Sequence, residues 1–153
     1  MSVKHFLHIS DYSKEELWEI LDLAKIVKSK FRKREDNKVF NNKSLAMIFA
    51  KPSARTRVSF ETGFEWMGGH ALFLGPNDIG IGKREAIKDI SRVLSRYNDI
   101  IMARLFEHEH IIELAEHSSV PIVNDPPGTR TIDLIFSSYF KTSNTSLRFF
   151  SEN

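Results

Sequence analysis

The stretch "SLAMIFAKPSARTRVSFE" (44–61) joins an apolar run to a polar loop that carries two arginines. Its first seven residues are almost all apolar, which favours a strand buried on both faces of a parallel sheet. A helical pattern begins near Ala54, directly after Pro52 and Ser53. We therefore expect a strand, a tight turn and a helix in succession, which is the first half of a βαβ unit.

Three further apolar runs follow this stretch and are separated by segments with helical spacing. The runs are "ALFLG" (71–75), "DIIMAR" (99–104) and "VPIVN" (120–124). The helical stripes between them are Val58, Phe64 and Met67, then Ile87, Ile90, Val93, Leu94 and Tyr97, and more weakly Ile111, Ile112, Leu114 and Ala115. The alternation predicts an α/β fold with a doubly wound, mainly parallel four-stranded sheet flanked by helices.

A further helix is expected before the sheet, where five apolar residues (Leu17, Ile20, Leu21, Ala24 and Val27) fall on one face. Ser13 and Glu16 have the spacing of a capping box at its start. The charged stretch "KSKFRKREDNK" (28–38) then predicts a solvated connection rather than more helix.

Composition excludes several classes of function. The chain has 153 residues and a net charge of +2, which is too small to argue for a nucleic-acid or membrane partner. It contains no cysteine, so disulfides and thiolate chemistry are excluded. No apolar run approaches the roughly 18 residues of a membrane span, and the charged start is unlike a signal peptide. We expect a cytoplasmic protein.

The loop after the first strand has the residues of an anion site. In open α/β sheets, ligands bind beyond the carboxyl ends of the strands. The helix that starts near Ala54 would direct backbone N–H groups at the loop, Ser53 and Thr56 would add hydroxyls, and Arg55 would add a guanidinium. Arg104 ends the third strand and should project toward the same edge. A solvated helix start without a ligand would show the same residues, so this pattern alone leaves both readings open.

Two weaker patterns are better explained without a ligand. "GPNDIGIGKRE" resembles a P-loop, but Asn77 stands where the first glycine is needed and Arg84 replaces the Ser or Thr. "EHEH" (107–110), with Glu113 and His117, is more typical of an exposed helix start than of a zinc site. We expect no metal and no cofactor.

Several longer segments resemble the aspartate and ornithine carbamoyltransferases. "SARTRVSFE" is similar to the phosphate-binding motif of that family, and residues 74–104 and "LAEHSSVPIVN" (114–124) are similar to its ornithine branch. The resemblance covers roughly residues 5–124. It implies a carbamoyl-phosphate-binding domain, a homotrimer, and a reaction in which an amine attacks the carbonyl carbon of carbamoyl phosphate while phosphate leaves.

The resemblance also implies roles for particular residues. Ser53, the Ala54 backbone, Arg55 and Thr56 would hold the phosphate of carbamoyl phosphate. Thr56 and Arg104 would also reach the carbonyl oxygen and so act as catalytic residues, because donors aimed at the developing charge lower the barrier. Arg57, the second arginine of the motif, is expected to be structural and to pair with Glu61 one turn later.

The chain departs from the family at three places. Ala54 replaces a Thr, which leaves the backbone donor intact, and Gly80 replaces a Gln that contacts a neighbouring subunit. After residue 124 the chain reads "DPPGTRTID" where the family has a His-Pro-x-Gln motif. We therefore expect a domain at 1–124 and a divergent, out-of-frame or poorly ordered tail at 125–153, in which a short helix is possible near 131–140. We also expect the ornithine-binding domain to be absent, so that ornithine would bind only if that domain is supplied.

Three functions remain open at this stage. The first is an ornithine carbamoyltransferase of arginine metabolism, represented by a truncated chain that binds carbamoyl phosphate without an amino-acid site. The second is a non-catalytic phosphate-binding or assembly module. The third is a related carbamoyltransferase with another amine specificity, since residues that select the amine lie in the absent half.

Overall fold

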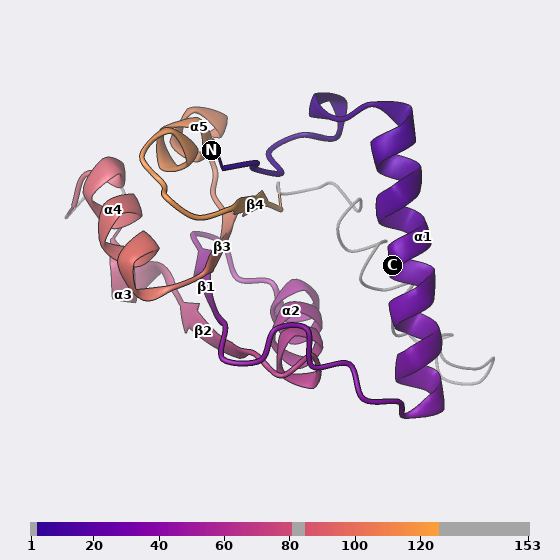
Figure 1. Cartoon of the computed structure of the whole chain (residues 1–153). Helices are drawn as coiled ribbons and strands as arrows, with labels where there is room; N and C mark the ends of the chain where they lie inside the picture. The colour runs from indigo at the N-terminus through magenta and orange to yellow at the C-terminus, as the bar shows by residue number, and fades with distance from the viewer. Residues whose placement is uncertain (1–2, 81–84, 126–153) are drawn as a thin grey trace, which may run out of the picture.

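The computed structural model describes residues 3–80 and 85–125, which form a sheet with helices on both faces (Figure 1). The expected helix near 131–140, and the rest of the tail beyond Asp125, lie outside these residues, as do Lys83 and Arg84. The helices are η1 (Ile9–Asp11), α1 (Lys14–Lys33), α2 (Ala54–Trp66), α3 (Pro76–Ile79), α4 (Ile87–Tyr97) and α5 (His108–Glu116). The strands are β1 (Ser44–Phe49), β2 (His70–Leu74), β3 (Ile100–Arg104) and β4 (Ile122–Asn124).

The four strands form one parallel sheet in the order β2-β1-β3-β4. This confirms the predicted doubly wound α/β fold. The chain adds β2 on one side of β1 and then crosses back to place β3 on the other side, so the strand order reverses at β1. The register pairs Phe49, the last residue of β1, with Arg104, the last residue of β3. The loops after these two strands therefore leave the same edge of the sheet at the point where ligands usually bind.

The apolar run of β1 is continuous because helices cover both faces of the sheet. Ala46 and Ile48 belong to the cluster that includes residues of α4 and α5. Leu45, Met47 and Phe49 belong to a second cluster with aromatic residues of α2. Side chains alternate across a strand, so a strand buried on both sides needs apolar residues at every position.

The helices bury only part of the predicted apolar stripes. Val58 is 60% exposed, Val93 54% and Tyr97 80%, so these members of the helical stripes do not face the core. Small residues pack inward on α4 instead, where Ser91 Oγ donates to the carbonyl of Leu114 at 2.6 Å. The short side chain lets α4 approach α5 closely, and periodicity of large apolar residues does not reveal such a contact.

The first long helix begins as predicted and ends later than predicted. The Ser13 hydroxyl accepts from the backbone N–H of Glu16, and the Glu16 carboxylate accepts from that of Ser13, which confirms the capping box. α1 continues through residues 28–33, so the prediction of a solvated connection is wrong there. The basic side chains in the last turn stabilise the helix, because they offset the partial negative charge at its carboxyl end. No residue of α1 is fully buried, and the helix lies to one side of the sheet (Figure 1).

Two local features were not expected. Residues 76–79 form the short helix α3, with Pro76 at its first position and Gly80 at its end with φ +58°. The segment before α1 also joins the sheet edge, because Phe6 forms a parallel bridge to Val123 and its N–H donates to the carbonyl of Ile122 at 2.7 Å.

None of the helices in residues 3–80 and 85–125 combines the length and apolar content needed to cross a membrane.

Candidate anion-binding site

Residues 51–57 lead from the carboxyl end of β1 into the first turn of α2. Ser53 directly precedes the helix, and its backbone is extended, with φ −152°. Its side chain does not cap the helix N-terminus; instead, Ser53 Oγ donates to Thr56 Oγ1 at 3.0 Å. Ala54 is exposed at the first helical position. The N–H groups at the amino end of α2 therefore face the loop without donating to the Ser53 hydroxyl, and this end of the helix carries partial positive charge.

The two arginines of the loop have different surroundings. Arg55 is exposed, and its guanidinium has no hydrogen bond or ion pair among the described residues. Arg57 Nε donates to Glu61 Oε2 at 3.0 Å, which confirms the predicted pairing. The Arg57 guanidinium also lies 4.0 Å from the ring centre of Phe73. Arg57 is thus held by the protein, whereas Arg55 is not held by any residue in the described part of the chain.

Arg104 lies next to this loop, as its position at the end of β3 predicts. Its side chain is 12% exposed, and Arg104 Nη1 donates to Thr56 Oγ1 at 3.3 Å. Within the described part of the chain, Arg104 Nε is buried and has no hydrogen-bond partner. The structure therefore joins three of the five predicted site residues, Ser53, Thr56 and Arg104, through a chain of hydrogen bonds. Arg55 and Ala54 lie in the same loop outside that chain.

Asp125 is a member of this cluster that sequence reasoning missed. Its side chain is 1% exposed, and its Oδ2 accepts from Arg104 Nη1 at 2.5 Å and from Thr56 Oγ1 at 3.1 Å. The Asp125 N–H donates to the carbonyl of Ala103 at 3.1 Å, which continues the β3–β4 pairing by one residue. The signal was available, because an acid directly after β4 must lie at the same sheet edge as Arg104. It was overlooked because residue 125 was placed in the divergent tail.

The hydrogen bonds of Thr56 are mutually consistent. Thr56 is fully buried. Its hydroxyl has one proton, which it gives to Asp125, and two lone pairs, which accept from Ser53 and Arg104. Every hydrogen-bonding capacity of the hydroxyl is used. The side chain is therefore fixed in one orientation at the centre of the site.

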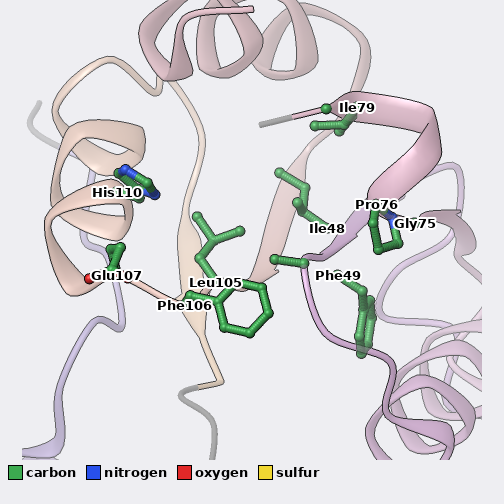
Figure 2. A pocket seen from close by; sticks show the side chains of 11 residues that line it. Ile48, Phe49, Gly75, Pro76, Ile79, Leu105, Phe106, Glu107 and His110 are labelled. Carbon is green, nitrogen blue, oxygen red and sulfur yellow. The ribbon is translucent and has the colours of Figure 1, made fainter. Parts of the chain in front are cut away.

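A cavity of about 390 Å³ opens beside the cluster, at the carboxyl ends of β1, β2 and β3. Figure 2 shows Glu107 and His110 on one side of it and Pro76 and Ile79 on the other, with Leu105 and Phe106 between them. None of the predicted site residues lines it. Its walls are mostly apolar, which does not favour the binding of an anion there.

Comparison with known proteins identifies the family of the chain. Residues 4–130 match the family described as aspartate/ornithine carbamoyltransferase, carbamoyl-P binding domain. The chain belongs to this family of transferases. It is 56% identical over 123 residues to "Ornithine carbamoyltransferase, chloroplastic" of Pisum sativum, covering 80% of the chain and 33% of that protein. It is 48% identical over 120 residues to an ornithine carbamoyltransferase of Haloquadratum walsbyi, covering 78% of the chain and 39% of that protein.

Solved structures of carbamoyltransferases share the fold. Ornithine carbamoyltransferase from Pyrococcus furiosus matches with a TM-score of 0.79 and 43% identity, over 82% of this chain and 40% of that one. The catalytic subunit of aspartate transcarbamoylase from M. jannaschii matches with a TM-score of 0.75 and 35% identity, over 84% of this chain and 42% of that one. The chain therefore spans well under half the length of these relatives, and the fold is common to both branches of the family.

Proposed function

We propose that residues 51–57 and Arg104 bind carbamoyl phosphate, and that this carbamoyltransferase domain serves the transfer of the carbamoyl group to ornithine. The observation that carries the proposal is the hydrogen bond between Thr56, in the first turn of α2, and Arg104, the last residue of β3, at the point where the strand order reverses. The identity of 56% to a protein named as an ornithine carbamoyltransferase supports the choice of ornithine over aspartate.

The phosphate would occupy the loop at the amino end of α2. Arg55 and the Ala54 N–H are donors there, and the helix dipole adds partial positive charge. The Ser53 hydroxyl becomes a further donor once its proton turns from Thr56 Oγ1 toward the phosphate. A hydrogen bond to a charged group contributes roughly 1.5–3 kcal/mol. Three or four such bonds are enough for micromolar binding, which corresponds to about 8 kcal/mol.

The carbonyl oxygen of carbamoyl phosphate would lie against Thr56 and Arg104. The amine nitrogen attacks the carbonyl carbon, the carbon–oxygen bond to phosphate breaks, and phosphate leaves with that electron pair. Negative charge grows on the carbonyl oxygen during the attack. The Arg104 guanidinium, held in place by its hydrogen bond to Thr56, stabilises that charge more in the transition state than in the ground state.

Turnover is proposed to require a second, ornithine-binding domain outside residues 4–130, so that the domain described here binds carbamoyl phosphate without completing the reaction. In that arrangement we expect a cytoplasmic homotrimer of arginine metabolism. The ion pair between Arg104 and Asp125 favours a second candidate, a phosphate-binding module without catalysis, because it engages the donor that the reaction needs. The likeness to aspartate transcarbamoylase supports a third candidate function, a carbamoyltransferase that acts on a different amine.

Isothermal calorimetry with carbamoyl phosphate and with inorganic phosphate tests the proposal. We expect Arg55→Ala to abolish detectable binding while the variant keeps a cooperative thermal transition. Arg57→Ala is the matched control, because Arg57 lies two residues away but is already held by Glu61 and Phe73. Equal binding by wild type and Arg55→Ala would remove the loop as the anion site. Adding ornithine should give no citrulline, because the amino-acid site is proposed to lie in a second domain; citrulline formation by this domain alone would overturn that part of the proposal.

A further inference from the structure

The Asp125 carboxylate lies where the proposed function needs a ligand oxygen. Its Oδ2 atom accepts from Thr56 Oγ1 at 3.1 Å and from Arg104 Nη1 at 2.5 Å. These are the two side chains assigned above to the carbonyl oxygen of carbamoyl phosphate. The acid comes from the chain itself and is 1% exposed, so the contact is built into the fold and is not a surface association.

A ligand oxygen cannot share these donors with Asp125 without a rearrangement. Thr56 has a single hydroxyl proton, and in this structure Asp125 receives it. The lone pairs of the same hydroxyl already accept from Ser53 and Arg104. An incoming carbonyl oxygen would therefore have to displace Asp125 from Thr56 or bind only to the remaining donors of Arg104.

The negative charge of Asp125, like its hydrogen bonds, opposes the binding of an anionic ligand at Arg104. Arg104 is the positive group deepest in the cluster, with 12% of its side chain exposed, and Asp125 compensates its charge. A phosphate compound carries up to two negative charges, so a fixed carboxylate beside its site repels it. The exposed guanidinium of Arg55 has no such partner among the described residues. The anion site is thus divided into an open part at Arg55 and a part at Arg104 that holds an internal acid.

We propose that Asp125 is an affinity-determining residue that occupies the carbonyl-oxygen position at Thr56 and Arg104, so that carbamoyl phosphate binds fully only after displacing it. This inference rests on the proposed function. It predicts that the wild-type chain distinguishes poorly between inorganic phosphate and carbamoyl phosphate, since both engage mainly the Arg55 part. Removing the carboxylate should favour carbamoyl phosphate, whose carbonyl oxygen can then reach Thr56 and Arg104.

The test compares the wild-type full chain with Asp125→Asn and with Asp99→Asn by calorimetry. Asp99 is a matched control: it also accepts from a basic side chain and a backbone N–H, those of Lys43 and Ser44, but at the amino end of the sheet. We expect Asp125→Asn to lower the Kd for carbamoyl phosphate by at least about tenfold and the Kd for inorganic phosphate by less. Asp99→Asn should change both by less than about twofold, because its charge is distant and screened.

The outcomes separate this inference from the proposed function. If wild type binds and Asp125→Asn binds equally or more weakly, Asp125 orients Arg104 instead of competing, and the inference fails while the proposed function stands. If neither chain binds either ligand, both fail. If only Asp125→Asn binds, both are supported. Thermal unfolding checks that each variant is folded, and Asp125→Ser provides a second uncharged side chain should the Asn variant not fold.

Discussion

Arg104 and Asp125 form an ion pair at 2.5 Å in which the two side chains are 12% and 1% exposed. Each other ion pair among the described residues leaves at least 35% of both side chains exposed. The buried pair is also the one that lies at the carboxyl edge of the sheet, where the anion site is proposed. Stability and ligand binding are therefore coupled at this position.

Removing the cation alone should destabilise the fold strongly. Arg104→Met leaves the Asp125 carboxylate buried without its partner, and we expect the free energy of unfolding to fall by about 3–5 kcal/mol. Urea denaturation measures this change. Arg57→Ala, which breaks an exposed pair with Glu61, should lower it by about 1 kcal/mol or less.

The double variant Arg104→Met with Asp125→Leu should recover most of that loss, because apolar residues often replace a buried ion pair without penalty. A double variant as unstable as Arg104→Met would mean that the lost packing of Arg104, and not the uncompensated carboxylate, causes the effect.

The Thr56 hydroxyl should contribute to stability through its three hydrogen bonds. Thr56→Val keeps the side-chain shape but removes the donor to Asp125 and the acceptor for Ser53 and Arg104. We expect the free energy of unfolding to fall by about 1–3 kcal/mol, measured by urea denaturation. The same substitution at the exposed Thr62 on the same helix should change it by less than about 0.5 kcal/mol. Equal effects at both positions would show that the buried network is energetically unimportant.

His5 should make stability depend on pH near neutrality. Burial lowers the pKa of His5 from its ordinary value of 6.5. Its Nδ1 atom accepts from the N–H of Ile122 at 3.2 Å, an interaction that protonation would remove. Below about pH 6.5 the unfolded chain binds the proton more readily than the folded chain. The free energy of unfolding should therefore decrease as pH falls through 6.5 and stop depending on His5 below the lowered pKa.

Denaturation of wild type and His5→Gln between pH 8 and pH 5 measures this effect. Glutamine can accept from the Ile122 N–H but does not titrate, so the difference between the two curves isolates His5. Parallel curves over the whole range would show that His5 titrates equally in the folded and unfolded chains.

The strands of the sheet could be predicted from the sequence because they are buried on both faces. A strand such as β1 must be apolar at every position, and that requirement makes a short continuous run visible without any structure. The end of each run also places its last residue, which is how Arg104 could be assigned to the edge occupied by Ser53 and Thr56.

Contacts of single polar atoms could not be predicted in the same way. Asp125 binds Thr56 at a separation of 69 residues, and nothing in the local pattern of either residue fixes that pairing. The helix faces were also ambiguous, because Ser91 and Ser95 are buried on α4 while Val93 is 54% exposed. Small polar residues that let two helices approach carry no hydrophobic signal, so a stripe of large apolar residues gives the wrong face.

The clearest test of such a face is on α5, whose weak apolar stripe was predicted to consist of Ile111, Ile112, Leu114 and Ala115. Leu114 is fully buried in the cluster with residues of β1 and α4, whereas Ile112 is 39% exposed. Leu114→Ala should lower the free energy of unfolding by about 2–5 kcal/mol, because it removes buried area and leaves a cavity. Ile112→Ala should lower it by about 1 kcal/mol or less. Since both substitutions shorten a branched aliphatic side chain on the same helix, helix propensity affects them similarly. The reverse order of effects in urea denaturation would mean that α5 packs on the sheet through its other face.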